Sequence, residues 1–134
     1  MDVNANNTIL IVDDEPLCIH FLVHILQKDY TIFVAKNGKS AVEIASNHLP
    51  DLILLDVDMP DMNGYETLSK LRESEATKTI PAIFITGRDA AEDHEKSHKL
   101  GAVDFIPKTA RPYLIKERVQ NQIKSVGISC KQTV

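Results

Sequence analysis

The sequence predicts a doubly wound α/β fold, in which a parallel β-sheet lies between two layers of helices. Two observations indicate this fold class. Short apolar runs alternate along the chain with longer segments of helical periodicity, as expected for a series of βα units. Three of the runs are apolar without interruption, which is typical of strands covered on both faces. We therefore expect a three-layer (βα)5 sandwich with right-handed crossovers around a five-stranded parallel sheet.

The predicted strands are five apolar runs, which in chain order are Thr8–Val12, Thr31–Ala35, Asp51–Leu55, Ile80–Ile85 and Val103–Ile106. The first, third and fourth runs are the uninterrupted ones. Strands buried on both faces lie in the middle of a parallel sheet, so we expect these three to be the central strands.

Helical periodicity is clearest in the first and last connecting segments. Apolar residues recur there at every fourth position, at Leu17, Phe21 and Ile25 and again at Ile115, Val119 and Ile123. Such spacing marks one face of a helix. Pro16 and Pro112 fit the first position of these two helices, where a missing backbone N–H is harmless. We expect the last helix to end at Val126.

Length and composition restrict the class of protein. The chain has 134 residues, which suits one domain, expected over residues 1–126 with a short polar tail over 127–134. The 15 basic and 19 acidic residues give a net charge of −4, so no basic field indicates direct nucleic-acid or membrane binding. Cys18 and Cys130 form no CxxC pair, and no segment resembles a signal peptide or a spanning helix. These features predict a cytoplasmic location.

Charged and hydroxyl side chains follow the ends of four predicted strands. Asp13 and Asp14 follow the first strand, Asp56 the third, Thr86 the fourth, and Lys108 comes shortly after the fifth. Ligands of doubly wound folds bind beyond the carboxyl ends of the strands, where the strand order reverses. We therefore expect these side chains to meet at one edge of the sheet.

Such a cluster of carboxylates requires a counter-charge. Each pair of carboxylates would repel by roughly 4 kcal/mol if about 4 Å apart in an effective dielectric near 20. Mg²⁺ fits, because it uses one or two carboxylates and leaves positions for waters and a phosphate. Asp56 is then the expected nucleophile of a phosphoryl transfer, with Lys108 and Thr86 as cation and donor. The alternative for any one carboxylate is a helix N-cap, a role that Asp14 or Glu15 fits.

Four motifs occur in order: ILIVDDEP, DLILLDVDMPDMNG, FITG and GAVDFIPK. Together they resemble the receiver domain of two-component response regulators, and the resemblance covers residues 8–126. It implies the strand order 2-1-3-4-5. It also implies a bacterial signalling protein rather than an enzyme, which takes a phosphoryl group on Asp56 from a sensor histidine kinase or a histidine phosphotransfer protein. Such a domain assists its own phosphorylation and dephosphorylation.

The resemblance also implies roles for the neighbouring residues. Asp13, Asp14 and Asp56 would hold Mg²⁺, with Asp14 binding directly, Asp13 through water, and the backbone carbonyl of Asp58 as a further ligand. Thr86 and Lys108 match the residues that grip the phosphoryl oxygens.

Phe105 matches an aromatic side chain that moves inward when the threonine moves; the alternative is simple core packing. The switched surface would be the fourth helix, fifth strand and fifth helix. Its partner would be a downstream protein or a C-terminal effector absent from this chain, and a phosphorylation-dependent dimer is a further expectation. Asp58 and Arg88 flank the mouth of the site, where this family tunes the phosphoryl lifetime. The family usually has proline after the lysine, but Lys108 precedes Thr109 here.

Three alternatives stay open. His94-Glu95-Lys96-Ser97-His98 fits the zinc motif H-E-x-x-H, although the segment is short and polar and offers no third ligand. The D-x-D formed by Asp56 and Asp58 also resembles haloacid-dehalogenase-type phosphatases, but there the motif follows the first strand. A binding module that never gains phosphate would leave Asp13, Asp14 and Lys108 unexplained.

Overall fold

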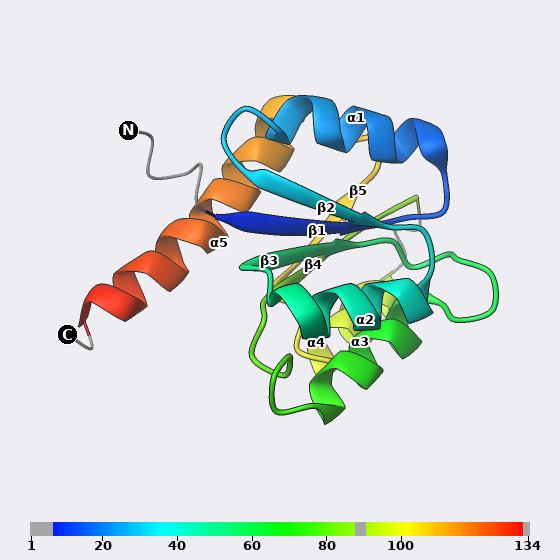
Figure 1. Ribbon diagram of the computed structural model, residues 1–134. Helices are drawn as coiled ribbons and strands as arrows, with labels where there is room; N and C mark the ends of the chain where they lie inside the picture. The colour runs from blue at the N-terminus through cyan, green and yellow to red at the C-terminus, as the bar shows by residue number, and fades with distance from the viewer. Residues whose placement is uncertain (1–6, 88–90, 133–134) are drawn as a thin grey trace.

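The computed structural model of the protein describes residues 7–87 and 91–132, which form alternating strands and helices (Figure 1). The strands are β1 Thr8–Val12, β2 Thr31–Ala35, β3 Leu52–Leu55, β4 Ala82–Thr86 and β5 Asp104–Pro107. The helices are α1 Pro16–Leu26, α2 Gly38–His48, α3 Gly64–Glu73, α4 Ala91–Lys99 and α5 Pro112–Gln132.

The five strands form one parallel sheet in the order β2-β1-β3-β4-β5, as predicted. Strand β1 is paired on both sides, with Val12 opposite Ala35 of β2 and Leu55 of β3. The strand order reverses between β1 and β3. The carboxyl ends of these two strands therefore flank the position where this fold binds ligands.

Two apolar layers hold the helices on the sheet. Alternate residues of the central strands point to opposite faces, so Leu10 and Ile53 belong to one layer and Ile9 and Leu52 to the other. Figure 1 shows α1 and α5 over one face and α2, α3 and α4 over the other. All residues of β3 and β4 are buried, which agrees with their uninterrupted apolar sequences.

Helix α1 forms where predicted but packs with a different face. Leu22 and Leu26 are buried, whereas Leu17 is 85% exposed and Phe21 38% exposed. The reason is that α1 is apolar on nearly every side, so spacing alone does not reveal which side meets the sheet. In α5 the predicted face, Ile115, Val119 and Ile123, is buried.

Helix α5 continues beyond the expected end at Val126 to Gln132. Gly127 does not end it, because one glycine inside a helix costs only about 1 kcal/mol relative to alanine. Among the described residues, no helix is long and apolar enough to cross a membrane.

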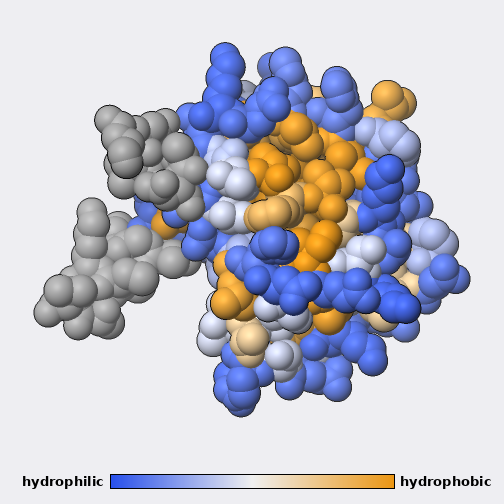
Figure 2. Space-filling view, in the orientation of Figure 1, coloured by the Kyte–Doolittle hydropathy of each residue, from blue (hydrophilic) through white to orange (hydrophobic). Residues whose placement is uncertain are grey.

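Edge strand β2 remains partly accessible. Ile32, Phe33 and Val34 are each only partly buried. Figure 2 shows apolar side chains gathered over this edge, between α1 and α2.

Candidate functional site

The ends of β1, β3 and β5 bring three charged side chains together. The Nζ of Lys108 lies 3.1 Å from Asp13 Oδ2 and 3.2 Å from Asp56 Oδ2. Asp13 is 2% exposed and Asp56 3% exposed, so the lysine meets two buried carboxylates. The structure thus places these predicted site residues together at the carboxyl edge of the sheet.

Glu15 joins this cluster, which sequence analysis did not predict. Its Oε1 lies 2.6 Å from the Nζ of Lys108, the shortest of the three lysine contacts. Glu15 occupies the N-cap position of α1, but its side chain makes no capping hydrogen bond. Its own backbone N–H instead donates to Asp13 Oδ1 at 2.9 Å. The capping role considered for Glu15 was therefore wrong, because its side chain pairs with Lys108.

The acidic cluster has the donor set of a hard cation site. Carboxylate oxygens of Asp13, Asp14 and Asp56 lie within 4.8 Å of one another, and Asp14 is exposed to solvent. Asp56 Oδ1 is buried and has no hydrogen-bond partner. A buried oxygen without a donor is costly unless a cation binds it. The residues present therefore fit Mg²⁺, which prefers such oxygens.

Burial and charge both perturb the titration of this cluster. Burial and the charge of Asp13 raise the pKa of Asp56 to about 6, although Lys108 opposes the shift. Burial alone would lower the pKa of Lys108, but hydrogen bonding to Glu15 and the charges of Asp56 and Asp13 raise it well above its ordinary value. Lys108 is thus a permanent cation, and Asp56 is mostly ionised at neutral pH.

Gly64 allows the loop after β3 to close behind Asp56. A Cβ on Gly64 would lie 2.2 Å from the backbone oxygen of Asp56, a distance that no side chain can occupy. The N–H of Gly64 donates to the Val57 carbonyl at 2.8 Å, and a capping box formed by Asn63 and Glu66 starts α3 at this point. The loop that carries Asp58 is therefore fixed by α3.

Thr86 and Lys108 are linked through the backbone at the end of the sheet. Thr86 is fully buried at the last position of β4, and its carbonyl accepts the N–H of Lys108 at 2.8 Å. The Lys108–Thr109 peptide is trans, because no described peptide bond is cis. The chain after β5 thus aims the lysine at Asp56 without the proline that is usual in the resembling family.

The Phe105 ring contacts β4 and α4. Its ring is 4.1 Å from that of His94 and 6.4 Å from that of Phe84, measured between centroids. The ring is only partly buried and packs against the core layer beneath α4. This placement is compatible with both roles considered for Phe105. Arg88 lies outside the described residues.

The H-E-x-x-H segment forms part of α4, and two of its side chains, His94 and Glu95, contact other residues. His94 packs on Phe105, and Glu95 pairs with Lys99 at 3.4 Å. Within the described part of the chain, every group of three or more candidate metal ligands includes Asp13. The D-x-D motif follows β3 rather than the first strand, unlike the pattern expected of a phosphatase of the haloacid-dehalogenase type.

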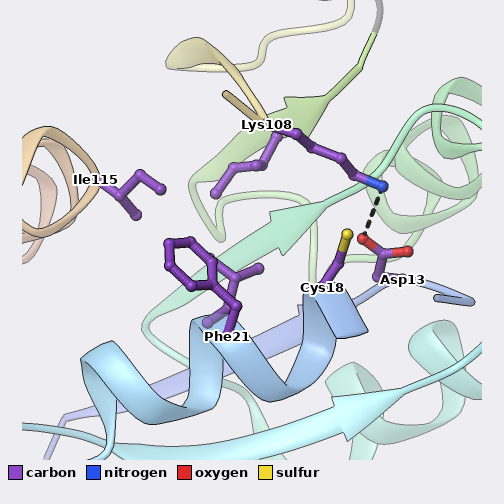
Figure 3. A pocket seen from close by; sticks show the side chains of 7 residues that line it. Asp13, Cys18, Phe21, Lys108 and Ile115 are labelled. Atoms are coloured by element: carbon purple, nitrogen blue, oxygen red, sulfur yellow. Dashed lines mark ion pairs between the residues drawn. The ribbon is translucent and has the colours of Figure 1, made fainter. Parts of the chain in front are cut away.

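A small hollow of about 30 Å³ adjoins Lys108 between α1 and α5 (Figure 3). Figure 3 shows Lys108 reaching from the end of β5 to Asp13, with the Cys18 thiol beside them. The Cys18 Sγ lies 3.7 Å from Glu15 Oε1, and burial raises the pKa of this thiol. Sequence analysis missed Cys18 as a neighbour of the site, because only the path of α1 brings it there.

The match to known families agrees with this geometry. The family described as the response regulator receiver domain matches residues 9–120. The chain belongs to this family. It is a phosphoacceptor domain of two-component signalling, and the predicted fold and function class are thereby confirmed.

Two relatives illustrate how receiver domains occur within longer proteins. The chain is 42% identical over 118 residues to a protein of Vibrio cholerae named probable cyclic di-GMP phosphodiesterase, covering 88% of this chain and 27% of that protein. It is 37% identical over 122 residues to histidine kinase P4 of Formosa agariphila, covering 89% of this chain and 9% of that protein. The chain therefore spans only a small part of either relative.

Solved structures match over nearly the whole receiver domain. The chemotaxis protein CheY4 of Vibrio cholerae has a TM-score of 0.82 at 27% identity, covering 87% of this chain and 98% of that chain. The receiver domain of a signal transduction histidine kinase from Syntrophus aciditrophicus has a TM-score of 0.82 at 35% identity, covering 90% and 92%.

Proposed function

We propose that this receiver domain accepts its phosphoryl group on Asp56, from a sensor histidine kinase or a histidine phosphotransfer protein. The supporting observation is the set of contacts that the two oxygens of the Asp56 carboxylate make. One oxygen contacts Lys108, and the other is buried without a hydrogen-bond donor. Burial weakens solvation of the nucleophile, and Lys108 stabilises the negative charge that reaches the site during transfer.

The transfer is a substitution at phosphorus. An Asp56 carboxylate oxygen forms the new P–O bond while the P–N bond of the donor phosphohistidine breaks, and the electron pair leaves with the imidazole nitrogen. Lys108 lies within 3.2 Å of Asp56 Oδ2, close enough to interact with a phosphoryl oxygen bound there. The Thr86 hydroxyl is the proposed second donor to the phosphoryl oxygens.

Mg²⁺ is the cofactor we propose, held by Asp13, Asp14, Asp56 and the backbone carbonyl of Asp58. Bound there, it would neutralise negative charge on the phosphoryl oxygens. Among the described residues, four carboxylates gather at the site, those of Asp13, Asp14, Glu15 and Asp56, and the Lys108 ammonium group pairs with three of them. This excess of negative charge supports cation binding.

Helix α1 carries the surface on which we place the phosphodonor protein. Leu17 and Phe21 are exposed apolar side chains, and Phe21 lines the hollow that reaches Asp13 and Lys108. Exposed apolar side chains beside a site are typical of a protein interface. One relative of this chain is named a histidine kinase, which supports a kinase-linked donor.

The output of the domain is proposed to pass through α4, β5 and α5. Capture of Thr86 by the phosphoryl group would make space for the Phe105 ring, which now packs on His94 of α4. The changed face would bind a downstream protein, an effector domain or a second phosphorylated copy. Asp58 and Arg88 are proposed to tune the phosphoryl lifetime.

Labelling with a small-molecule phosphodonor in Mg²⁺ tests the acceptor. We expect intact-mass analysis to find one phosphoryl group on the protein, none on the Asp56→Asn variant, and one on the control variant Asp29→Asn. Omission of Mg²⁺ should slow labelling strongly. Full labelling of folded Asp56→Asn would refute the assignment. Turnover of many equivalents would favour the phosphatase alternative, and no labelling would favour the binding module.

A further inference from the structure

A continuous set of ring contacts connects two helices, α3 and α4, with two strands, β4 and β5. Tyr65 of α3 packs edge-on against Phe84 of β4, with 5.2 Å between centroids. Phe84 contacts Phe105 of β5, and Phe105 contacts His94 of α4. The rings therefore form one layer between the sheet and α4, and the candidate switch residue Phe105 lies within it.

A hydrogen bond also connects Tyr65 to α4. The hydroxyl of Tyr65 donates to Asp93 Oδ1 at 2.7 Å and lies 3.5 Å from the Asp93 backbone oxygen, and both residues are buried. The Lys96 Nζ lies 4.5 Å from the Tyr65 ring. A short hydrogen bond to a buried carboxyl group is strong, because its loss leaves a polar group without water. Tyr65 thus fastens α4 to the start of α3.

The position of Tyr65 connects this bond to the phosphoryl site. Tyr65 directly follows Gly64, whose backbone closes against Asp56. On α4, Asp93 directly precedes His94, which packs on Phe105. The short Tyr65–Asp93 hydrogen bond therefore joins the loop behind the acceptor to the helix that contacts the switch ring.

We propose that Tyr65 and Asp93 form a latch, defined as this hydrogen bond, which holds α4 in the position where His94 packs on Phe105. The proposal rests on the proposed function, because the latch opposes the inward movement of Phe105 that phosphorylation favours. Tyr65 acts through Asp93 and His94, so it is a positioning residue for the switch.

Linkage makes this proposal measurable without a partner protein. If the latch stabilises the arrangement that binds the phosphoryl group less tightly, phosphorylation must weaken the latch. Removing the latch must then raise the affinity for the phosphoryl group. Beryllofluoride with Mg²⁺ serves as the phosphoryl mimic. A merely structural role of Tyr65 would lower the stability of the protein and would not raise affinity for the mimic.

The test compares the full chain with its Tyr65→Phe variant, which keeps the ring and removes the hydroxyl. We expect the affinity for beryllofluoride in Mg²⁺ to rise about two- to tenfold, the range for one net hydrogen bond. Tyr113→Phe makes the same chemical change at an exposed site and should leave the affinity unchanged. Ser97→Ala removes a different hydrogen bond to Asp93, at its backbone oxygen, and should have a smaller effect.

A double-variant cycle provides the second measurement. Asp93→Ala removes the same bond, so the double variant Tyr65→Phe/Asp93→Ala should bind the mimic about as tightly as either single variant. Unchanged or weakened binding by Tyr65→Phe, or fully additive effects, would overturn the latch while leaving the proposed function intact. If the unmodified chain does not bind the mimic, both the latch and the proposed function fail.

Discussion

Lys108 is bound more closely by Glu15 than by Asp56, with Nζ–oxygen distances of 2.6 Å and 3.2 Å. Glu15 is largely exposed, whereas Asp56 is buried. The lysine is therefore shared between a surface carboxylate and Asp56, the proposed acceptor. Any phosphoryl group on Asp56 must compete with Glu15 for the same ammonium group.

Removing this competitor should favour phosphorylation. We expect Glu15→Gln to raise the rate of labelling by a small-molecule phosphodonor by up to about fivefold, a modest effect because exposed ion pairs are weak. The measurement is the initial labelling rate at fixed Mg²⁺. Glu43→Gln, on α2, is the control. A rate below that of the unmodified protein would show that Glu15 assists Lys108 rather than competes for it.

Asp56 should make stability depend on pH in a defined direction. Its pKa is about 6 in the folded protein against an ordinary value of 3.8, so the folded state binds this proton more tightly. The resulting stabilisation is present below about pH 4 and is lost as pH rises through about 6. Asp56→Asn should therefore exceed the unmodified protein in unfolding free energy at pH 7, by up to about 3 kcal/mol.

Urea denaturation of both proteins in EDTA at pH 4.5 and pH 7 measures this difference. We expect the advantage of Asp56→Asn to shrink at the lower pH, whereas Asp29→Asn should show no such trend. An equal advantage at both pH values would contradict the raised pKa of Asp56.

Without Lys108, the stability of the protein should depend on a metal ion, because the clustered carboxylates would lose their positive partner. Lys108→Met removes an ammonium group that contacts Asp13, Glu15 and Asp56. Breaking a buried ion pair by removing one partner costs about 3–5 kcal/mol. We expect a loss of this size in EDTA and partial recovery in millimolar Mg²⁺, measured by urea denaturation. A loss that Mg²⁺ does not reduce would argue against cation binding by these carboxylates.

Gly64 should tolerate no side chain. Gly64→Ala would bring a Cβ to 2.2 Å from the Asp56 backbone oxygen, so the loop after β3 must shift. We expect a loss of more than about 2 kcal/mol in unfolding free energy, as for other strained or overpacked sites, together with slower labelling. Gly87→Ala is the matched control, because its Cβ meets no atom within 4 Å. Equal stability of the two variants would contradict the packing described for Gly64.

Strand ends were predictable from the sequence, and with them most of the charged cluster. Asp13, Asp56 and Lys108 follow strands whose apolar residues are consecutive or nearly so, and parallel pairing brings those ends together whatever the loops do. The packing face of α1 was not predictable, because α1 has apolar residues on several sides and Leu17 fits a helical repeat although it is exposed.

Contacts that depend on side-chain conformation were also beyond sequence analysis. Glu15 lies at the N-cap position of α1, and its contact with Lys108 depends on the rotamers of two long side chains. The Tyr65–Asp93 hydrogen bond joins side chains of two different helices, α3 and α4, that are 28 residues apart in the sequence. No spacing rule in the sequence connects residues of that kind.

The parallel sheet affects the folding of the protein, because it brings together residues that are far apart in the sequence. Asp56 and Lys108 are 52 residues apart, and Glu15 and Lys108 are 93 apart, so the charged cluster depends on contacts of long sequence separation. Such contacts form slowly, because a large loop must close before they can stabilise the chain. Because Lys108 follows β5, the last strand in the chain, a chain still emerging from the ribosome carries Asp13 and Asp56 before it carries the lysine that pairs with them.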